Sequence, residues 1–173
     1  MTKSTKLLAL AVSAGLALAA GTASALPNPV TATFQVSATV LKACTVSATA
    51  LAFGNYTPSA GPVTNSSSIS VGCTNGTPYT MTVGAGSTTG ATIVQRLMTN
   101  GTQTLQYNLY TSNTYATLLG DGTTGGSAKV TGTGAGLASL TTTTVYGQLV
   151  DSAANQAVPP GNYTDTVTVS VAY

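Results

Sequence analysis

Few residues of this sequence carry side chains that could do chemistry. Histidine, glutamate and tryptophan are absent, and the only carboxylate side chains are those of Asp121, Asp151 and Asp165, which lie well apart in the chain. General acid–base catalysis and metal binding both need such groups in clusters. We therefore expect no enzymatic activity, no catalytic residues, no cofactor and no metal site.

Two glycine-rich stretches, TVGAGSTTGA (82–91) and TGTGAGL (131–137), could be compared with phosphate-binding loops. Both lack the G-K-[ST] residues of a phosphate loop, and neither lies in a convincing βαβ unit. Such stretches are typical of turns in a β protein that is rich in glycine and threonine. The sequence therefore gives no indication of a nucleotide site.

The N-terminal residues have the pattern of a secretory signal peptide. Lys3 and Lys6 precede an apolar run over 7–20, and the small residues of 23–25 follow it. The run of about 14 residues is shorter than the roughly 20 apolar residues of a membrane-spanning helix. We expect residues 1–25 to be a signal peptide that is cleaved after Ala25, so that no membrane span remains.

The two cysteines, Cys44 and Cys73, form an even pair in a chain that we expect to be exported. A disulfide is the usual state of such a pair in an oxidising compartment. Two thiolates alone are too few for a zinc site, and there is no C-x-x-C motif of a redox centre. We predict one structural disulfide between Cys44 and Cys73.

Removal of the signal peptide leaves a nearly neutral chain of about 148 residues, which suffices for one domain. Three cations, Lys42, Arg96 and Lys129, then balance three aspartates. A neutral surface has no electrostatic footprint for nucleic acid. We therefore expect no nucleic-acid partner.

Most of the remaining chain has the composition of short strands. Segments rich in Thr, Val and Tyr alternate with turn-forming pairs such as Asn75-Gly76 and Asp121-Gly122. The segment GATIVQRLMTNG (90–101) is also predicted to be strand or irregular, because Thr92, Ile93 and Val94 are β-branched. An all-β domain, either a sandwich or a barrel, is expected. The predicted strands cover 66–73, 78–86, 104–111, 128–134, 141–150 and 163–173.

Both ends of the mature chain alternate strictly between apolar and polar residues, as strands with one buried face do. At the front, over 28–40, one face carries Val30, Ala32, Phe34 and Val36, and continues through Ala38 and Val40. At the back, one face carries Tyr163, Asp165, Val167, Val169, Val171 and Tyr173. Because the predicted strand over 28–40 lies at the N-terminal end of the mature chain, it could join the sheet of its own domain or that of another protein.

The sequence resembles the spore coat protein U domain family, which includes subunits of archaic chaperone-usher pili. The resemblance covers essentially the whole mature chain, and its most specific pieces are CTVSATALAFGNY, YNLYT, GDGT and GNYTDTVTVSVAY. The family pattern usually has an acidic residue, an Arg and a Trp where this chain has Ser112, Tyr115 and Leu119. These departures affect local packing and surface detail.

The resemblance implies an immunoglobulin-like β-sandwich that lacks its last strand and is completed by donor-strand complementation. Residues 26–36 would be the donor segment, with Val30, Ala32, Phe34 and Val36 as its inserted side chains, and residues 37–173 would be the pilin domain. A periplasmic chaperone would pair with the last strand, and the C-terminal carboxylate of Tyr173 would anchor it. The residues of that pairing are Tyr163, Val167, Val169, Val171 and Tyr173.

The function implied is that of a structural pilus subunit. It would be exported through the periplasm to the cell surface, assembled by an outer-membrane usher with copies of itself or related pilins, and would support surface adhesion and biofilm formation. Three alternatives stay open. Residues 28–46 could form one edge strand of a complete domain, and the protein could be a non-polymerising spore-coat or surface protein. It could also be a ligand-binding adhesin module, with Tyr110 and Tyr115 in its binding patch.

Overall fold

The computed structural model describes residues 28–173. The predicted signal peptide, the cleavage point and the first two residues of the predicted donor segment lie outside the described residues. The chain divides into two compact units, Met1–Thr39 and Val40–Tyr173, and each is described by itself. Within residues 28–173 no helix is long and apolar enough to cross a membrane.

The described part of the first unit, residues 28–39, contains neither helix nor strand, and each of its residues is exposed. The side chains of Val30, Phe34 and Val36 are 84%, 87% and 81% exposed. A single segment forms no ladder of hydrogen bonds without a neighbour, so the strand predicted over 28–40 is absent from this part of the chain. The alternative of one edge strand over 28–46 is wrong for this structure, because pairing begins only at Cys44.

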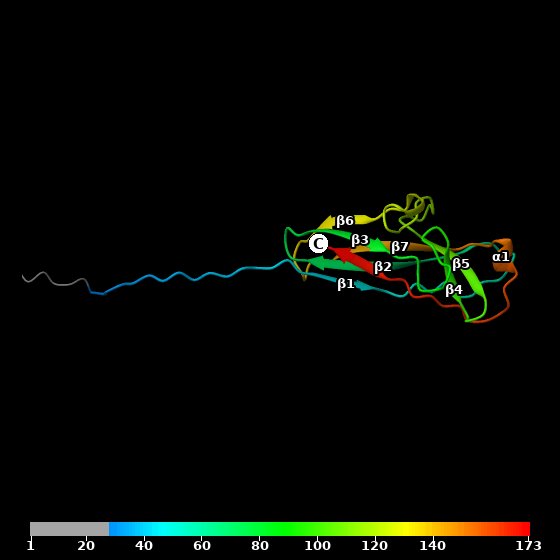
Figure 1. Cartoon of the computed structure of the whole chain (residues 1–173), viewed down its shortest axis with the longest axis horizontal. Coiled ribbons are helices and arrows are strands. Elements are labelled where there is room, and N and C mark those ends of the chain that lie inside the picture. The colour runs from blue at the N-terminus through cyan, green and yellow to red at the C-terminus, as the bar shows by residue number, and fades with distance from the viewer. Residues whose placement is uncertain (1–27) are drawn as a thin grey trace, which may run out of the picture. The chain divides into compact units, whose positions relative to one another are not determined.

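The second unit is built on two antiparallel sheets (Figure 1). Sheet A has five strands in the order β1-β2-β7-β5-β4, and sheet B has three in the order β6-β3-β8. The strands of sheet A are β1 (Cys44–Ala48), β2 (Val63–Cys73), β7 (Thr141–Leu149), β5 (Thr104–Tyr110) and β4 (Arg96–Thr99). Those of sheet B are β6 (Val130–Thr133), β3 (Pro78–Val83) and β8 (Val169–Ala172).

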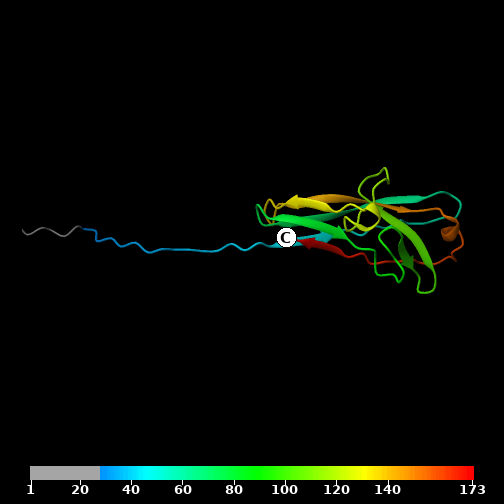
Figure 2. The same cartoon turned by 45° about the horizontal axis from the view of Figure 1, so that its top comes forward.

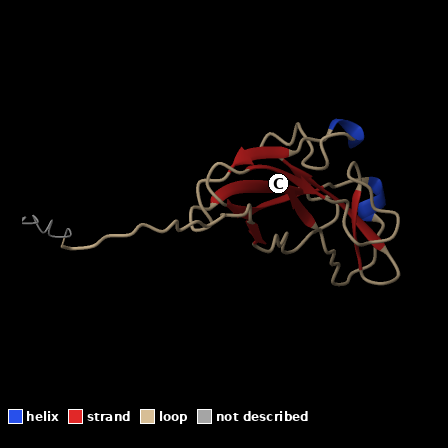
Figure 3. Cartoon of the chain, turned by 60° about the vertical axis from the view of Figure 1, so that its left-hand side comes forward, coloured by secondary structure: helices blue, strands red, loops and turns tan. Residues whose placement is uncertain are grey.

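The two sheets form the layers of a β-sandwich (Figures 2 and 3), which confirms the predicted all-β class and selects the sandwich over the barrel. Alternate residues of the strands point inward and form the core between the layers. Sheet A contributes Ile69, Val71, Tyr107, Leu109 and Val145, and sheet B contributes Tyr79, Met81 and Val83.

The predicted disulfide is present between Cys44 and Cys73. The two residues are direct partners in the register of β1 and β2, and the Cys73 side chain is almost completely buried. The bridge therefore ties the first strand of the sandwich to its neighbour at the point where the second unit's pairing begins.

The predicted strand at the C-terminus is shorter than its alternating pattern suggested. Only Val169–Ala172 pairs as β8, although the pattern begins at Tyr163. The segment ahead of β8 makes an isolated bridge between Thr164 and Thr99 of sheet A before it joins sheet B. A segment that changes sheets cannot keep one continuous ladder, so the alternation extends further than the pairing.

Two short helices were not predicted. The helix α1 (Ala153–Gln156) begins after Ser152, whose side chain accepts a hydrogen bond from the amide of Asn155, as N-cap residues do. The 3₁₀ turn η1 (Thr124–Gly126) lies in the glycine-rich stretch after Asp121. Both occur in connections, where four residues or fewer give too little periodicity to detect.

Candidate functional site

The two strands next to the chain's ends in the second unit, β1 and β8, each have a neighbour on one side only. In sheet A, β1 pairs with β2, and in sheet B, β8 pairs with β3. Each strand therefore leaves backbone amide and carbonyl groups of its outer edge without a ladder partner among the described residues. Such an edge is a template on which a further strand can pair.

A groove of about 1260 Å³ lies between the segments that continue these two strands. One wall is the segment 48–58, which continues β1, and the other is the segment 158–169, which leads into β8. The floor consists of core side chains, among them Ile69, Met98, Leu105, Leu109, Val145 and Leu149. The groove exceeds the 300–1,000 Å³ that is usual for small-molecule sites, and its floor is the core of the sandwich.

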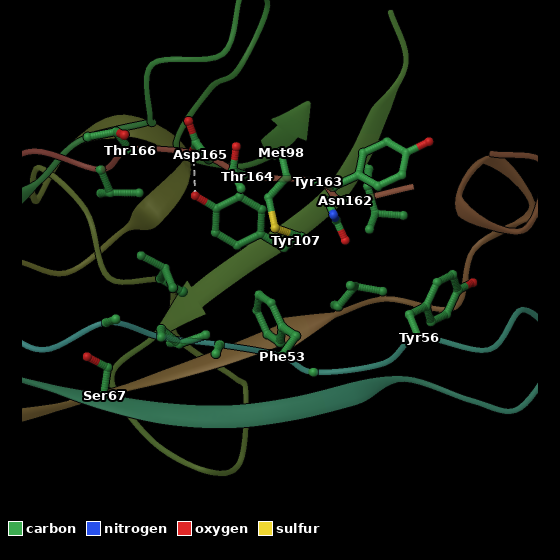
Figure 4. Close-up of a pocket in the computed structure, with 18 of the residues that line it drawn as sticks. Phe53, Tyr56, Ser67, Met98, Tyr107, Asn162, Tyr163, Thr164, Asp165 and Thr166 are labelled. Atoms are coloured by element: carbon green, nitrogen blue, oxygen red, sulfur yellow. Dashed lines mark hydrogen bonds between the residues drawn. The ribbon is translucent and has the colours of Figure 1, made fainter. Parts of the chain in front are cut away.

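Phe53 and Tyr107 face each other within the groove (Figure 4). Their ring centroids are 5.9 Å apart at an interplanar angle of 64°, an edge-to-face contact. Phe53 and Leu51 reach over Gly147 of β7, where a Cβ atom would approach them within 3.0 Å. The glycine thus lets the 48–58 wall pack against the floor.

Asp165 places a carboxylate in the wall of the groove that leads into β8. Its Oδ2 accepts a 2.6 Å hydrogen bond from the hydroxyl of Tyr107, drawn as a dashed line in Figure 4, and its Oδ1 accepts bonds from Ser87 and Thr88. Burial alone would raise the pKa of Asp165, but the bonds from Tyr107 and Ser87 outweigh it and lower this pKa. Burial, together with the neighbouring Asp165, raises the pKa of Tyr107 far above its ordinary value. The carboxylate and the neutral phenol are therefore the stable forms at neutral pH.

Arg96 of β4 lies entirely inside the sandwich, although it is charged. Its guanidinium donates hydrogen bonds to four backbone carbonyl oxygens, those of Gly84, Ile93, Val83 and Leu119, at 2.8 to 3.3 Å. Burial lowers the pKa of Arg96, and the nearby Tyr107 and Asp165 oppose this effect. Because Val83 belongs to sheet B, the side chain joins the two layers by hydrogen bonds.

Asp151 holds the other wall of the groove, the segment 48–58, by hydrogen bonds. It accepts hydrogen bonds from the hydroxyl of Tyr56 at 2.6 Å and from the amides of Ser59 and Gly61 at 3.2 and 2.9 Å. These donors all lie in the connection between β1 and β2. Asp151 therefore fixes the end of the wall that is distant from β1. Desolvation and the bond to Asp151 raise the pKa of Tyr56 to about 12.

The structure distributes the predicted site residues over both units. Tyr163, Val167 and Val169 line the groove, and Val171 packs against the core from β8. Tyr173 is 58% exposed. The predicted donor residues all lie within residues 28–39, which form no strand, namely Val30, Ala32, Phe34 and Val36. Within residues 28–173, no three metal-ligating side chains lie close enough together to hold an ion.

Several residues of the groove and of its supports were not singled out from the sequence. Phe53, Tyr56 and Tyr107 line the groove, whereas Arg96 and Asp151 support it by hydrogen bonds. Asp165 did leave a signal, because it shares its face of the alternating segment with Val167 and Val169. A carboxylate on an apolar face requires hydrogen-bond donors. Here these donors come from residues 58 or more positions away in the chain, and the sequence does not reveal that proximity.

Comparison with known families matches the Spore Coat Protein U domain to residues 30–170. The chain belongs to this family. The match includes both walls of the groove and all described strands except the last residues of β8. The predicted resemblance is thereby confirmed. Comparison with curated protein sequences finds no match.

Among solved structures, the spore coat protein U domain chain is similar to a chain in the crystal structure of the CsuC–CsuE chaperone–tip adhesion subunit pre-assembly complex from archaic chaperone-usher Csu pili of Acinetobacter baumannii. The TM-score is 0.52 and the sequence identity is 24%. The match covers 78% of this chain and 40% of that chain. This likeness supports the sandwich fold.

Proposed function

We propose that this protein is a structural subunit of a chaperone-usher pilus. In this proposal it polymerises by placing its N-terminal segment in the groove of a second copy. The observation that carries the proposal is the coexistence of two features: an open, mainly apolar groove between the segments that continue the edge strands β1 and β8, and an exposed alternating segment without a partner. The two features are complementary in chemistry, because a strand in the groove would gain ladder hydrogen bonds on its edges and a core on one face.

The side chains that enter the groove are those of one face of the segment, namely Val30, Ala32, Phe34 and Val36. Each large apolar side chain removed from water contributes about 1.5 to 3 kcal/mol. Phe34 is the largest and is 87% exposed in this structure, so its burial contributes most. Backbone hydrogen bonds to the groove edges then fix the register of the inserted strand.

An open groove has to be covered before assembly, because a free strand edge promotes aggregation. A periplasmic chaperone that pairs along β8 and the segment before it fulfils this need. The chaperone contacts residues of one alternating face of this segment, namely Tyr163, Val167, Val169, Val171 and Tyr173. The family membership and the chaperone in the similar Csu complex support this partner, and an outer-membrane usher follows from the same route to the cell surface. The resulting fibre supports surface adhesion and biofilm formation.

The test uses the full precursor, expressed in a periplasm together with its chaperone and usher. Phe34→Asp places a charge among the inserted side chains, whereas Gln35→Asp places the same charge on the opposite face and serves as the control. Gels of unboiled samples should show ladders of polymers for the wild type and Gln35→Asp and only monomer for Phe34→Asp. Monomers in all three cases, equally stable without a chaperone, would favour the non-polymerising surface protein instead.

A further inference from the structure

The groove wall that leads into β8 passes from one sheet of the sandwich to the other. Thr164 exchanges backbone hydrogen bonds of 2.9 and 3.0 Å with Thr99 of sheet A. Four residues later, the carbonyl of Thr168 accepts a 2.9 Å bond from the amide of Gly84, and Val169 then pairs with Val83 of sheet B. Residues 165–167 are therefore the crossing between the layers, and they lie along the groove.

Asp165 is the first residue of this crossing, and its carboxylate is saturated with hydrogen bonds. Oδ1 accepts from the amides of Ser87 and Thr88 at 2.9 and 3.2 Å and from their hydroxyls at 3.1 and 3.2 Å. Oδ2 accepts from the Tyr107 hydroxyl at 2.6 Å. The carboxylate thus connects the crossing to β5 of sheet A and to the loop that follows β3 of sheet B.

The loop approaches the carboxylate closely because residue 86 is glycine. Gly86 has a φ of +106°, and a Cβ atom built on it would lie 2.0 Å from Oδ2 of Asp165. Both the backbone conformation and the space require glycine at this position. The close approach of the loop to the Asp165 carboxylate therefore depends on glycine at position 86. An aspartate that was only solvated would not require this.

An apolar residue at position 165 would continue the stripe formed by Val167 and Val169. It could not hold the loop at 87–88, because an unpaired amide requires an acceptor. We propose that Asp165 is a positioning residue that fixes where the groove wall crosses between the sheets, and so sets the groove width that a strand from a second copy encounters. This inference rests on the proposed donor-strand function.

The test measures binding of a labelled peptide with the sequence of residues 28–40. The receiving protein is the mature chain with Phe34→Asp, whose own segment is a poor donor and whose groove is unchanged. Asp165→Asn should weaken peptide binding about tenfold, since hydrogen bonds to a charged acceptor are lost or weakened. Asp121→Asn is the matched control, because Asp121 also accepts several bonds within its own loop but does not line the groove.

The outcomes separate the two proposals. Equal binding by the Asp165→Asn and unsubstituted receivers, or an equal loss in Asp121→Asn, would overturn the role of Asp165 and leave the donor-strand function standing. Failure of the unsubstituted receiver to bind the peptide would overturn both. If Asp165→Asn does not fold, the double variant Ser87→Ala, Thr88→Val decides, since it removes two hydroxyl donors and keeps the carboxylate. It should weaken binding a few-fold, and unchanged binding would again reject the role.

A pH profile distinguishes positioning from a general loss of stability. The titratable groups that face Asp165 are Tyr107 and Arg96, and neither changes charge in mild acid. Peptide binding by the unsubstituted receiver should weaken in strong acid, as the pH falls through the lowered pKa of the Asp165 carboxyl group, whereas the Asp165→Asn receiver should lack this component. Parallel profiles of the two receivers would contradict the proposal.

Discussion

The hydroxyl of Tyr56 donates a 2.6 Å hydrogen bond to Oδ1 of Asp151, across 95 positions of the chain. The bond attaches the connection between β1 and β2 to the segment that follows β7. Tyr56 also lines the groove. The disulfide holds the start of β1, and the bond to Asp151 holds the end of the wall that follows β1.

The first prediction concerns the titration of Tyr56. Its pKa of about 12 reflects desolvation first and the bond to Asp151 second. Asp151→Asn removes the negative charge and should therefore lower this pKa toward the ordinary value of about 10. The pKa can be followed by NMR of ring carbons, with Tyr56→Phe identifying the signal. Asp121→Asn should leave the titration of Tyr56 unaltered, and a pKa that stays at about 12 in Asp151→Asn would contradict the assignment.

The second prediction concerns the disulfide. The bridge closes a loop with a sequence separation of 29. Replacement of both cysteines by serine should lower the free energy of unfolding by about 3 to 4 kcal/mol, because the unfolded chain regains the entropy of that loop. Urea denaturation measures the loss, and the wild-type protein in reductant should unfold at the same midpoint as the double variant. An unchanged midpoint in both would show that the bridge does not limit stability.

The third prediction concerns Arg96. Arg96→Met leaves four backbone carbonyls without their donor inside the sandwich, so the free energy of unfolding should fall by at least about 3 kcal/mol. Arg96→Lys should lie between this variant and the wild type, because one ammonium cannot reach all four oxygens. The exposed cation Lys129 provides the control: Lys129→Met should change the stability by no more than about 0.5 kcal/mol. Equal urea midpoints for the two methionine variants would refute the role of Arg96.

The fourth prediction concerns stability in acid. Hydrogen bonds hold the pKa values of Asp121, Asp151 and Asp165 below their ordinary range in the folded protein. The unfolded chain therefore binds more protons below about pH 4, and stability falls as the pH falls through the folded-state pKa values. The melting temperature should be constant from about pH 7 to 5 and should fall in stronger acid. Each single Asp→Asn variant should show a shallower decline, and a melting temperature that rises in acid would disprove the assignment.

The sequence predicted the class of fold because its strands alternate and its turns carry Gly, Asn and Pro. The disulfide followed from the even pair Cys44 and Cys73 in a chain that is expected to be exported, and the family followed from local motifs. In contrast, the walls of the groove depend on residues that are distant in the chain. Asp151 meets Tyr56, and Asp165 meets Tyr107, only once the sheets are layered.

The C-terminal segment illustrates the limit of periodicity. The pattern over 163–173 correctly places Val167, Val169 and Val171 toward the core, whereas Tyr173, on the same predicted face, is 58% exposed. It does not reveal that the segment changes its pairing partner between Thr164 and Val169. Alternation reports burial on one face, whereas sheet membership depends on which neighbour offers hydrogen bonds, and that is decided by the tertiary fold.

The carboxylates of this protein also determine how it responds to salt. Each of the three aspartates accepts its bonds from neutral groups, namely amides and hydroxyls, and the Arg96 guanidinium donates its hydrogen bonds to neutral carbonyls. Dissolved ions screen the attraction between exposed opposite charges, but they act weakly on short contacts of this kind. The folded protein should therefore be equally stable at low and at high salt concentration.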